Sequence, residues 1–328
     1  MKFILAALAT VALGAFSSGH AQTPPATGAD PCGGRTVRVV VPFAPGGALD
    51  TVARLVSQKL GEKLNQPFVV ENKPGAANII GNDLVAKSAP DGCTLLFAAA
   101  PIALNQALGI KTPYDVQKDL TPISLVASGG VLVLVHPSTP YKTMQDIIQA
   151  AKSNPAGLVY ATAGVGSMPH LIGEGWRVQT GAKLIHVGYK GSSQAMQDAV
   201  AGNVTVLLDG YIPSGAQVHA GKLRAIAYGA PTRSAQLPNV PTTAEQGFPD
   251  LVGGGFFGLM APAATPKPMI DKLAASVREV LAQPDVRDRL SRQGYEIHGS
   301  TPAEYSAFIR REIERWTPVV KAAGIKPD

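Results

Sequence analysis

The sequence of 328 residues is poor in cysteine, with two, and in charged and aromatic residues, at 16% and 6%. After the N-terminal segment, no stretch reaches the ~20 apolar residues that a membrane-spanning helix needs. The patterns GxxxxGK[ST], GxSxG and HExxH are absent, so the sequence does not support the phosphate-cradling, serine-hydrolase or zincin sites that they mark. Two thiols are too few for a metal site of their own. We therefore expect no cofactor and no metal.

A basic surplus is present, because lysine and arginine outnumber aspartate and glutamate by 29 to 23. Nucleic-acid-binding proteins usually concentrate such charge in basic runs or interleave it with aromatic residues. Neither pattern occurs here, so we expect no nucleic-acid partner. A mild positive surplus suits a protein that meets anionic ligands, and it equally suits simple solubility.

The first 21 residues have the composition of an export signal. Lys2 supplies a positive charge, residues 3–16 are apolar, and residues 19–21 (Gly-His-Ala) form a small-x-small cleavage site. We expect cleavage after about Ala21 and no membrane insertion of the mature chain. Residues 22–34 are rich in proline, glycine and threonine, which predicts a leader with little structure.

The two cysteines, Cys32 and Cys93, precede predicted strands. In an exported protein such a pair usually forms a disulfide, and two free thiols are the alternative. If the strands that follow them are parallel neighbours, both thiols lie at the same edge of the sheet. A disulfide is then within reach, helped by the flexible Gly33 and Gly34.

The strand Val37–Val41 and the loop after it form the most informative stretch. A run of this kind, nearly all valine, is typical of a strand buried on both faces of a parallel sheet. Pro42 and Pro45 lack the N–H groups that would continue a ladder, and Gly46 and Gly47 allow a tight turn. The helix that opens around Leu49 therefore presents unpaired N–H groups and the positive end of its dipole. We predict an anion site at this loop.

Strands and helices alternate through the rest of the first third. Such alternation predicts an α/β fold with a parallel sheet and right-handed crossovers. The predicted strands also end in small-residue loops, at the edge where open α/β sheets bind ligands. These elements are strands at residues 67–71 and 94–98, helices at 51–64 and 78–86, and the loop 99–101 that begins with Ala99.

Two glycine-rich segments predict a division into two lobes. Residues 128–130 separate two apolar runs, and a glycine cluster precedes the apolar run that ends at 261. Glycines can absorb the backbone rotation of a hinge. We predict one discontinuous lobe at 35–127 and 254–328, to which three C-terminal helices return, and a second lobe at 128–253. Residues 253–258 also satisfy GxGxxG, but they lack the strand–turn–helix context of a dinucleotide site.

Three residues of the second lobe carry candidate chemistry. His170 at a helix start could be a ligand or acid–base group, or a capping residue. Ser167 could be a nucleophile beside it, and we prefer a donor to a carboxylate oxygen, which needs no activation. Asp209 ends a buried apolar strand, where a charge needs partners. It could cap the next turn, or receive a hydroxyl, ammonium or water from a ligand.

Several segments in order resemble one family. They include VPFAPGGALDTVARLVSQKL, VVENKPGA, APDGCTLLFA, YATAGVGSMPHL, HVGYKGSSQA and FGLMAPAATP. Together they resemble the Bug-type receptors, the periplasmic substrate-binding proteins of tripartite tricarboxylate transporters (TctC-like), over residues 36–326. The resemblance implies a periplasmic location and a type II periplasmic binding protein fold, with two α/β lobes, a hinge and a ligand cleft between them.

The resemblance also implies a site in which backbone N–H groups and ordered waters of both lobes hold a carboxylate. By motif, the first lobe contributes Phe43, Ala44, Pro45, Gly46, Gly47 and Asp50, with Ala99 nearby. The second lobe contributes Thr162, Ala163, Gly164, Gly166, Ser167 and His170, with Tyr189 and Asp209 toward the far end of the ligand. Departures at 75–77, 98–101 and 168–169 indicate a more apolar far end, suited to an aromatic or longer aliphatic carboxylate.

We thus expect a monomeric receptor that binds a small carboxylate, either a di- or tricarboxylate or an aromatic carboxylate, and delivers it to membrane permease subunits. An exported hydrolase that uses Ser167, His170 and Asp209 is one alternative. A ligand sensor that docks on a kinase is another. No nucleophile–base pattern in the sequence favours the hydrolase, and the sequence does not separate the transporter from the sensor.

Overall fold

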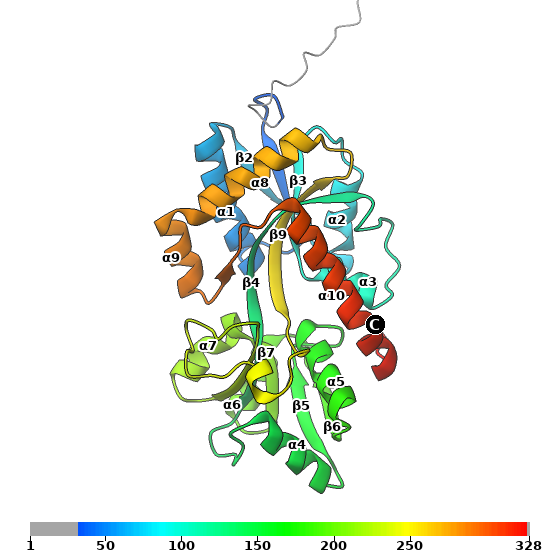
Figure 1. Cartoon of the computed structure of the whole chain (residues 1–328), viewed down its shortest axis with the longest axis vertical. Helices are drawn as coiled ribbons and strands as arrows, with labels where there is room; N and C mark the ends of the chain where they lie inside the picture. The colour runs from blue at the N-terminus through cyan, green and yellow to red at the C-terminus, as the bar shows by residue number, and fades with distance from the viewer. Residues whose placement is uncertain (1–31, 327–328) are drawn as a thin grey trace, which may run out of the picture.

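The computed structural model describes residues 32–326, which form an elongated molecule of two α/β halves (Figure 1). The predicted signal peptide, its predicted cleavage site and most of the predicted leader lie outside the described residues. The upper half contains the N-terminal and C-terminal parts of the chain, and the lower half contains the middle part. The long strands β4 (Leu120–Val135) and β9 (Gly254–Pro262) run through both halves and join them. The lobe boundaries given above remain a prediction.

A single path of strands crosses both halves. The order along it is β2-β1-β3-β9-β4-β7-β5-β6, and the short strand β10 and strand β8 pair with β4. In the upper half β1 is parallel to β2 and β3, and in the lower half β5 is parallel to β6 and β7. The upper-half elements before β4 are β1 (Val37–Val41), α1 (Ala48–Leu64), β2 (Phe68–Asn72), η1 (Ala76–Asn78), α2 (Ile79–Ala86), β3 (Thr94–Ala99) and α3 (Pro101–Ala107).

The lower half repeats the strand–helix alternation, and the chain then returns to the upper half. The lower elements are α4 (Met144–Ser153), β5 (Leu158–Thr162), α5 (Met168–Thr180), β6 (Leu184–Gly188), α6 (Ser192–Val200), β7 (Val206–Gly210), α7 (Tyr211–His219), β8 (Arg224–Gly229) and η2 (Ala244–Gln246). The returning elements are α8 (Lys267–Ala282), α9 (Pro284–Arg292), β10 (Glu296–Ile297) and α10 (Pro302–Ala323).

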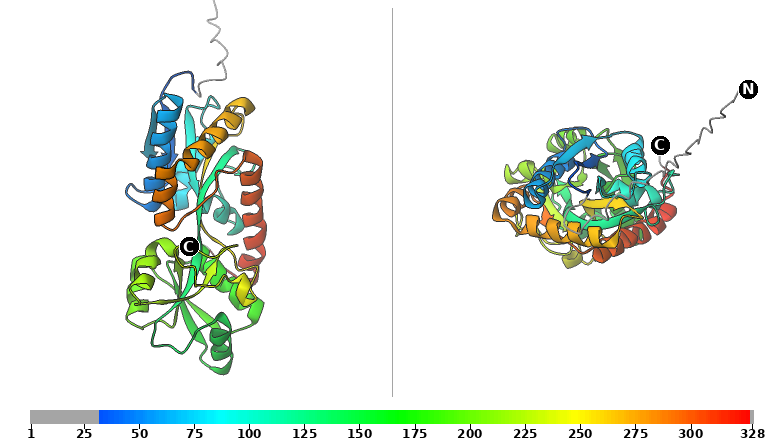
Figure 2. Two further views of the ribbon diagram at one scale, coloured as in Figure 1. Left: turned by 60° about the vertical axis from the view of Figure 1, so that its left-hand side comes forward. Right: turned by 90° about the horizontal axis from the view of Figure 1, so that it is seen from above.

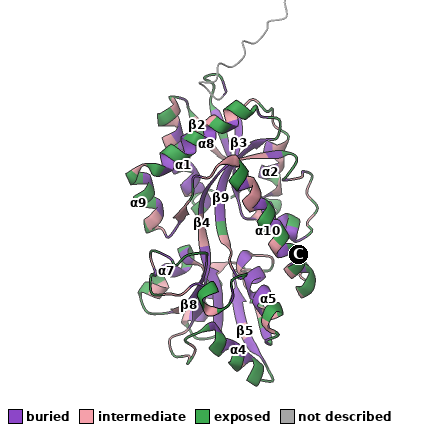
Figure 3. Cartoon of the chain, viewed as in Figure 1, coloured by how far each residue is buried: buried purple, intermediate pink, exposed green. Residues whose placement is uncertain are grey.

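The side chains of β1 point alternately to the two faces of the sheet, and both faces are buried, which explains the nearly unbroken run of valines. Val39 and Val41 enter one hydrophobic cluster with Leu95 and Phe97 of β3, and Val40 enters another on the opposite face. Helices cover both faces of the upper sheet, so apolar side chains are buried on both sides (Figure 3). The predicted strand Val37–Val41 and the predicted parallel pairing with β3 are confirmed.

The register of β4 places the ligand-binding edges of the two sheets opposite each other. Ala99 at the carboxyl end of β3 pairs with Phe257 of β9, which pairs with Ala127 of β4. Gly210 at the carboxyl end of β7 pairs with Val131 of β4. Four residue steps of ~3.3 Å therefore separate the two edges, or about 13 Å along β4. Both carboxyl edges face the junction between the halves.

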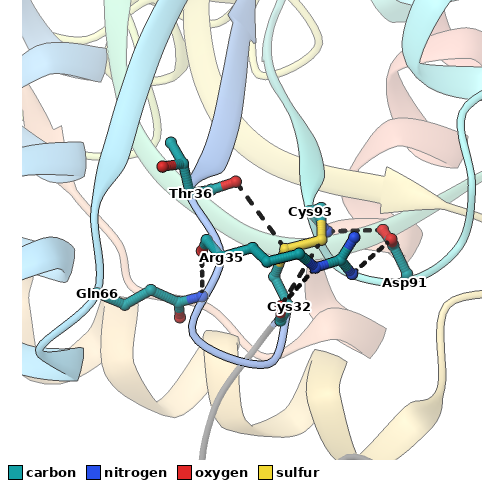
Figure 4. A network of polar contacts seen from close by, with 6 residues as sticks. All are labelled: Cys32, Arg35, Thr36, Gln66, Asp91 and Cys93. Carbon is teal, nitrogen blue, oxygen red and sulfur yellow. Dashed lines mark hydrogen bonds and ion pairs between the residues drawn. A yellow bond between two sulfur atoms is a disulfide. The ribbon is translucent and has the colours of Figure 1, made fainter. Parts of the chain in front are cut away.

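A disulfide closes the opposite, amino-terminal edge of the upper sheet. Cys32 and Cys93 are bonded, with 4.8 Å between their Cα atoms (Figure 4). Arg35 Nη2 lies 2.9 Å from Asp91 Oδ2, and Asp91 Oδ1 accepts the Cys93 N–H. The predicted disulfide is thus present, at the end of the sheet away from the ligand-binding edge.

Helix α10 packs along both halves, against α3 above and α5 below (Figures 1 and 2). Its buried Trp316 lies against Gly175 of α5 and Gly253, just before β9. The helix continues through Pro318 to Ala323. The lost hydrogen bond of Pro318 is offset by the burial of Val320.

Other predictions of element boundaries need correction. The two apolar runs around 128–130 form one strand, β4, because Gly129 and Gly130 pair with Gly255 and Gly254. Helix α3 begins at Pro101, inside the segment 99–101 that was predicted as a loop, and α7 begins at Tyr211, directly after β7. Loops that end this early bring the helix N-termini closer to the strand ends.

Candidate ligand-binding site

The loop between β1 and α1 is exposed at the junction of the halves. Phe43, Ala44, Pro45, Gly46 and Gly47 are all exposed, whereas the side chain of Asp50 is buried. Helix α1 begins after Gly47 without a side-chain cap. Its first N–H groups have no intrahelical partner, so the loop offers free donors and the positive end of the dipole.

Asp50 holds this loop rather than facing outward. Its carboxylate accepts hydrogen bonds from the Gly46 N–H, at 2.9 Å, and from Arg54 and Asn72, both at 2.9 Å. The Arg54 guanidinium, the Gly46 N–H and Asn72 together lower the pKa of Asp50 to about 2, against the opposing effect of burial. The Gly46 N–H therefore points at Asp50, and Gly46 has a φ of +86°.

Two asparagines that sequence reasoning missed brace the same loop. Asn72 at the end of β2 donates to the Phe43 carbonyl at 3.0 Å as well as to Asp50. Asn78 was predicted to cap α2 but makes no side-chain capping bond, and donates instead to the Pro42 carbonyl. Asn72 ends β2, the neighbouring strand, and Asn78 follows it; their amide groups suit bonds to loop carbonyls.

Ala99 lies at the carboxyl end of β3 with its side chain in the core. It is 6% exposed and belongs to the cluster on the α1 side of the sheet. Its methyl group therefore packs inside the upper half. Any contact of Ala99 with a ligand has to come from the backbone.

The loop after β5 is held by a compact set of hydrogen bonds. Buried Thr162 donates from its hydroxyl to the Gly164 carbonyl at 3.2 Å and accepts the Gly164 N–H at 3.3 Å. Ser167 caps α5, donates to the Gly164 carbonyl at 2.7 Å, and accepts the His170 N–H at 3.4 Å. The Ser167 hydroxyl proton is thus used within the loop.

His170 is buried behind this loop, 5% exposed. Its Nδ1 accepts the Gly166 N–H at 3.1 Å, and its ring stacks on His186 with 3.8 Å between the ring centroids. His186, which sequence reasoning missed, has its Nε2 2.8 Å from the Thr162 hydroxyl. Burial lowers the pKa of His170, and burial followed by the neighbouring His170 lowers the pKa of His186 to about 4.

Tyr189 and Ala163 connect the β5 loop to the loop after β6. The Tyr189 N–H donates to the Thr162 carbonyl at 3.0 Å, and the Gly191 N–H donates to the Ala163 carbonyl at 2.9 Å. The Tyr189 hydroxyl donates to Asp198 of α6 at 2.5 Å. These two loops therefore form one surface, and the Tyr189 phenol is directed at α6.

Asp209 at the end of β7 links the starts of α6 and α7. Its carboxylate accepts from Ser192 Oγ and the Gly210 N–H, both at 2.9 Å, and from Ser214 Oγ at 3.3 Å. Burial raises the pKa of Asp209, and these hydrogen bonds oppose that effect. Asp209 thus organises the following turn, and its contact with a ligand stays a prediction. Ser192 and Ser214 were not among the predicted site residues.

The three residues of the hydrolase alternative do not form a catalytic relay. Ser167 Oγ donates to the Gly164 carbonyl, His170 Nδ1 accepts from the Gly166 backbone, and Asp209 bonds to Ser192, Ser214 and Gly210. A nucleophile needs its base within hydrogen-bond reach, and the base needs an orienting group. Each of the three side chains instead shapes a loop.

Helix starts on the lower edge match that of α1 above. α6 begins after Gly191 and α7 after Gly210, and neither has a side-chain cap. By contrast α4 and α10, which begin away from these edges, both have complete capping boxes. Helix N-termini without caps thus lie on both edges of the junction.

Exposed apolar side chains accompany these helix starts. Large hydrophobic residues are 36–53% exposed at the carboxyl ends of β1, β2, β5, β6 and β7, on both halves. They are Phe43, Ile80, Val165, Val187 and Ile212. The two edges therefore combine backbone donors with apolar side chains.

A cavity of about 610 Å³ lies between the halves, and none of the predicted ligand-binding residues lines it. Its floor is the glycine pairing of β4 and β9, and its walls include His298 after β10 and Phe308 and Arg315 of α10. We assign the cavity to the hinge and place the candidate site at the two carboxyl edges.

Residues 32–326 contain neither a metal-binding cluster nor a membrane-spanning helix. No three histidine, cysteine, aspartate or glutamate side chains in this part of the chain form a group that could hold a metal ion. None of its helices is both long and apolar enough to cross a bilayer.

Comparison with known proteins identifies the family. Residues 52–325 match the tripartite tricarboxylate transporter family receptor, TctC. The chain belongs to this family. The TctC receptor is also 35% identical over 300 residues to the protein BugT of Bordetella pertussis, an alignment that covers 91% of this chain and 92% of BugT.

Solved structures share the fold of this TctC receptor. Rpa4515 of R. palustris, solved with adipate, is 32% identical with a TM-score of 0.75, covering 90% of this chain and 99% of that one. MatC (Rpa3494) of Rhodopseudomonas palustris, with bound malate, is 34% identical with a TM-score of 0.71, covering 87% and 99%. The predicted periplasmic binding protein fold is confirmed, and the chain is a solute-binding receptor of the TctC/Bug family.

Proposed function

We propose that this receptor is a periplasmic monomer that binds a small carboxylate between its halves and delivers it to the permease subunits of a tripartite tricarboxylate-type transporter. The observation that carries the proposal is the set of uncapped helix starts of α1, α6 and α7. They lie on two sheet edges that face each other across the hinge. Free N–H groups and helix dipoles favour an anion at this junction.

The chemistry of the edges supports a carboxylate with an apolar body. The predicted site residues contain no lysine or arginine, so backbone donors have to supply the contacts to the charged end. The five exposed apolar side chains defined above can cover a hydrocarbon chain or ring. Adipate and malate, which two relatives bind, fit this description, and we propose an aliphatic dicarboxylate or an aromatic carboxylate.

We propose that the loop 43–47 holds one carboxylate and that the loops around 162–167, 189 and 209 select the rest of the ligand. The N–H groups of Gly47 and Val165 donate no hydrogen bond to any described residue. Rotation at the paired glycines of β4 and β9 would bring these donors together around one ligand. Asp50, His170 and Asp209 act in this proposal by holding the loops.

A calorimetric ligand panel tests the proposal. Adipate, malate, shorter and longer aliphatic dicarboxylates and benzoate are titrated into the mature protein at neutral pH. We expect at least one carboxylate to bind, and to raise the melting temperature by several degrees at about 100 times its Kd, since such an excess stabilises the folded state by about 2.7 kcal/mol.

The neutral diamide of the best dicarboxylate is the matched control. It preserves the length and the apolar body but removes the charge. We expect it to bind at least tenfold more weakly, a loss of about 1.4 kcal/mol. Equal binding of diamide and diacid, or no binding of any carboxylate, would overturn the proposal. Uptake of the bound carboxylate by cells with and without the receptor tests the delivery step.

A further inference from the structure

His170, which is buried, and His186, which is partly buried, form a stacked pair directly behind the loop after β5. His170 comes from the start of α5 and His186 from β6, and their rings are 3.8 Å apart at an angle of 24°. Tyr160 of β5 also lies beside His186, with 5.1 Å between the ring centroids. The pair therefore belongs to a continuous packed layer between the loop and the core of the lower half.

Each ring is bonded to a different part of the loop. His170 Nδ1 accepts the Gly166 N–H, so this nitrogen carries no proton and the neutral ring has its proton on Nε2. The Thr162 hydroxyl donates to the Gly164 carbonyl, so His186 Nε2 acts as a donor to Thr162 Oγ1. Together the two rings hold both ends of the loop, at Thr162 and Gly166.

The surroundings favour neutral rings. The carboxylate that acts on both histidines is Glu174, one helical turn after His170. Glu174 is itself engaged by the Tyr160 hydroxyl at 2.6 Å and by Arg177 at 2.7 Å. Leu108, which follows α3 and is apolar, lies beside the position of Gly166, whose N–H donates to His170. A proton on one ring would therefore be poorly compensated and would lie against the other ring.

We propose that His170 and His186 are a positioning pair that keeps the β5 loop in its ligand-binding shape only while both rings are neutral. The inference rests on the proposed function, because it assigns regulation to the same site. A proton on His170 has to enter at Nδ1, which would then be a donor facing the donor N–H of Gly166. The hydrogen bond would be lost, the Gly166 peptide would turn, and Val165 beside it would move. Acidification thus weakens ligand binding.

The first test needs no ligand. In the ¹⁵N-labelled mature protein, ring nitrogen shifts report the tautomer and charge of His170, and hydrogen exchange reports the Gly166 amide. We expect a neutral Nε2–H ring and a protected Gly166 amide at about pH 7, and both to change with one midpoint on acidification. A charged His170 ring at about pH 7 would overturn the proposal. So would a Gly166 amide whose hydrogen exchange does not change as His170 titrates.

Two substitutions of His170 separate the hydrogen bond from the titration. In His170→Asn, the amide oxygen can occupy the place of Nδ1 and accept the Gly166 N–H without titrating. In His170→Leu no acceptor remains. We expect a protected Gly166 amide at all pH values in the first variant and an unprotected one in the second. His186→Gln keeps a donor for Thr162 but removes the stacked ring, so the midpoint of His170 should move up toward its ordinary value.

Calorimetry with the best carboxylate of the ligand panel then links the pair to binding. Protonation of the ligand itself affects wild type and His170→Asn equally, so the ratio of their affinities does not depend on it. We expect this ratio to fall about fivefold between about pH 7 and about pH 4.5, the effect of one neutral hydrogen bond. A constant ratio would overturn the regulatory role even where the nuclear magnetic resonance result holds. If no carboxylate binds at any pH, the proposed function fails instead.

Discussion

Asp50 shows how one buried carboxylate shapes the loop that faces the junction. It accepts from the Gly46 backbone, from Arg54 and from Asn72, and Asn72 in turn holds the Phe43 carbonyl. Asp209 does the same for the starts of α6 and α7. At the scale of single residues, the polar side chains of the site are mostly occupied with backbone, which leaves the remaining backbone donors for the ligand.

The Asp50 contacts predict a pH dependence of stability. The pKa of Asp50 in the folded protein, about 2, lies below its ordinary 3.8. The unfolded chain is therefore protonated first on acidification, so the stabilisation is complete above about pH 4 and is lost as the pH falls through 2. We expect a contribution of about 1–2 kcal/mol, reduced because Arg54 is half exposed. Urea unfolding of Asp50→Asn at several pH values should show a shallower acid loss than wild type.

Gly46 and Gly47 form a matched pair of test sites. Gly46 has a φ of +86°, whereas Gly47 has −77°, and a Cβ added at either would meet no atom closer than 3.9 Å. Gly46→Ala should therefore cost about 1–2 kcal/mol from backbone strain alone and weaken carboxylate binding. Gly47→Ala should leave the free energy of unfolding within about 0.5 kcal/mol of wild type. Equal effects would mean that the loop does not need this backbone conformation.

At the scale of elements, three helices whose starts face the junction, α1, α6 and α7, have no side-chain cap, and α8 and α9 also lack one. α4 and α10 have capping boxes built on Thr143 and Thr301, and α1, α6 and α7 begin after glycines. Of the helix starts that face the junction, α5 has a side-chain cap, in which Ser167 accepts the His170 N–H. A ligand anion can take the place that a capping side chain has in other helices.

The disulfide of the upper half predicts a stability change without a binding change. It joins two cysteines that are 61 residues apart in the sequence. The double variant Cys32→Ser, Cys93→Ser should lose about 2–4 kcal/mol of unfolding free energy. Carboxylate affinity should be unchanged, because the bond lies at the edge of the sheet opposite the site. A tenfold loss of affinity in a variant that is still folded would contradict this separation.

Sequence reasoning predicted the strands, the disulfide edge and the positions of the loops, because valine alternation, prolines and glycines act locally. It did not predict that the Gly46 N–H turns to Asp50, or that His186 from a different strand stacks on His170. Both depend on contacts between segments that are distant in the sequence. It also placed a break at Gly129 and Gly130, where cross-strand pairing with β9 keeps the strand continuous.

At the scale of the whole molecule, the halves are joined through paired glycines. Gly129 faces Gly255 and Gly130 faces Gly254 across β4 and β9. Tyr228 of β8 fills the space beside Gly130, accepts its N–H at 2.8 Å, and donates to Glu296 of β10 at 3.4 Å. The connection between the halves, formed by β4 and β9, is therefore narrow. The Tyr228 hydroxyl of the lower half also bonds to the Glu296 carboxylate of the upper half.

Substitutions of Gly254 and Gly255 form a second matched pair, which tests the connection made by β4 and β9. A Cβ at Gly254 would collide with the Gly129 carbonyl oxygen, whereas a Cβ at Gly255 would meet nothing within 4 Å. Gly254→Ala should lose about 1–3 kcal/mol of stability and change the angle between the halves. In Gly255→Ala, the stability and the angle between the halves should stay close to those of wild type. Thermal unfolding and small-angle X-ray scattering measure the two effects, and identical scattering from both variants would contradict the hinge assignment.

The packing of α10 along both halves has an optical consequence. The sequence contains two tryptophans, Trp176 in α5 and Trp316 in α10; both are buried, and Trp316 lies against Gly175 of α5. Trp316 also lies against Gly253, at the start of the crossing strand β9. Rotation of one half against the other would change the surroundings of an indole ring, so intrinsic fluorescence would follow the movement in the unlabelled protein and in real time.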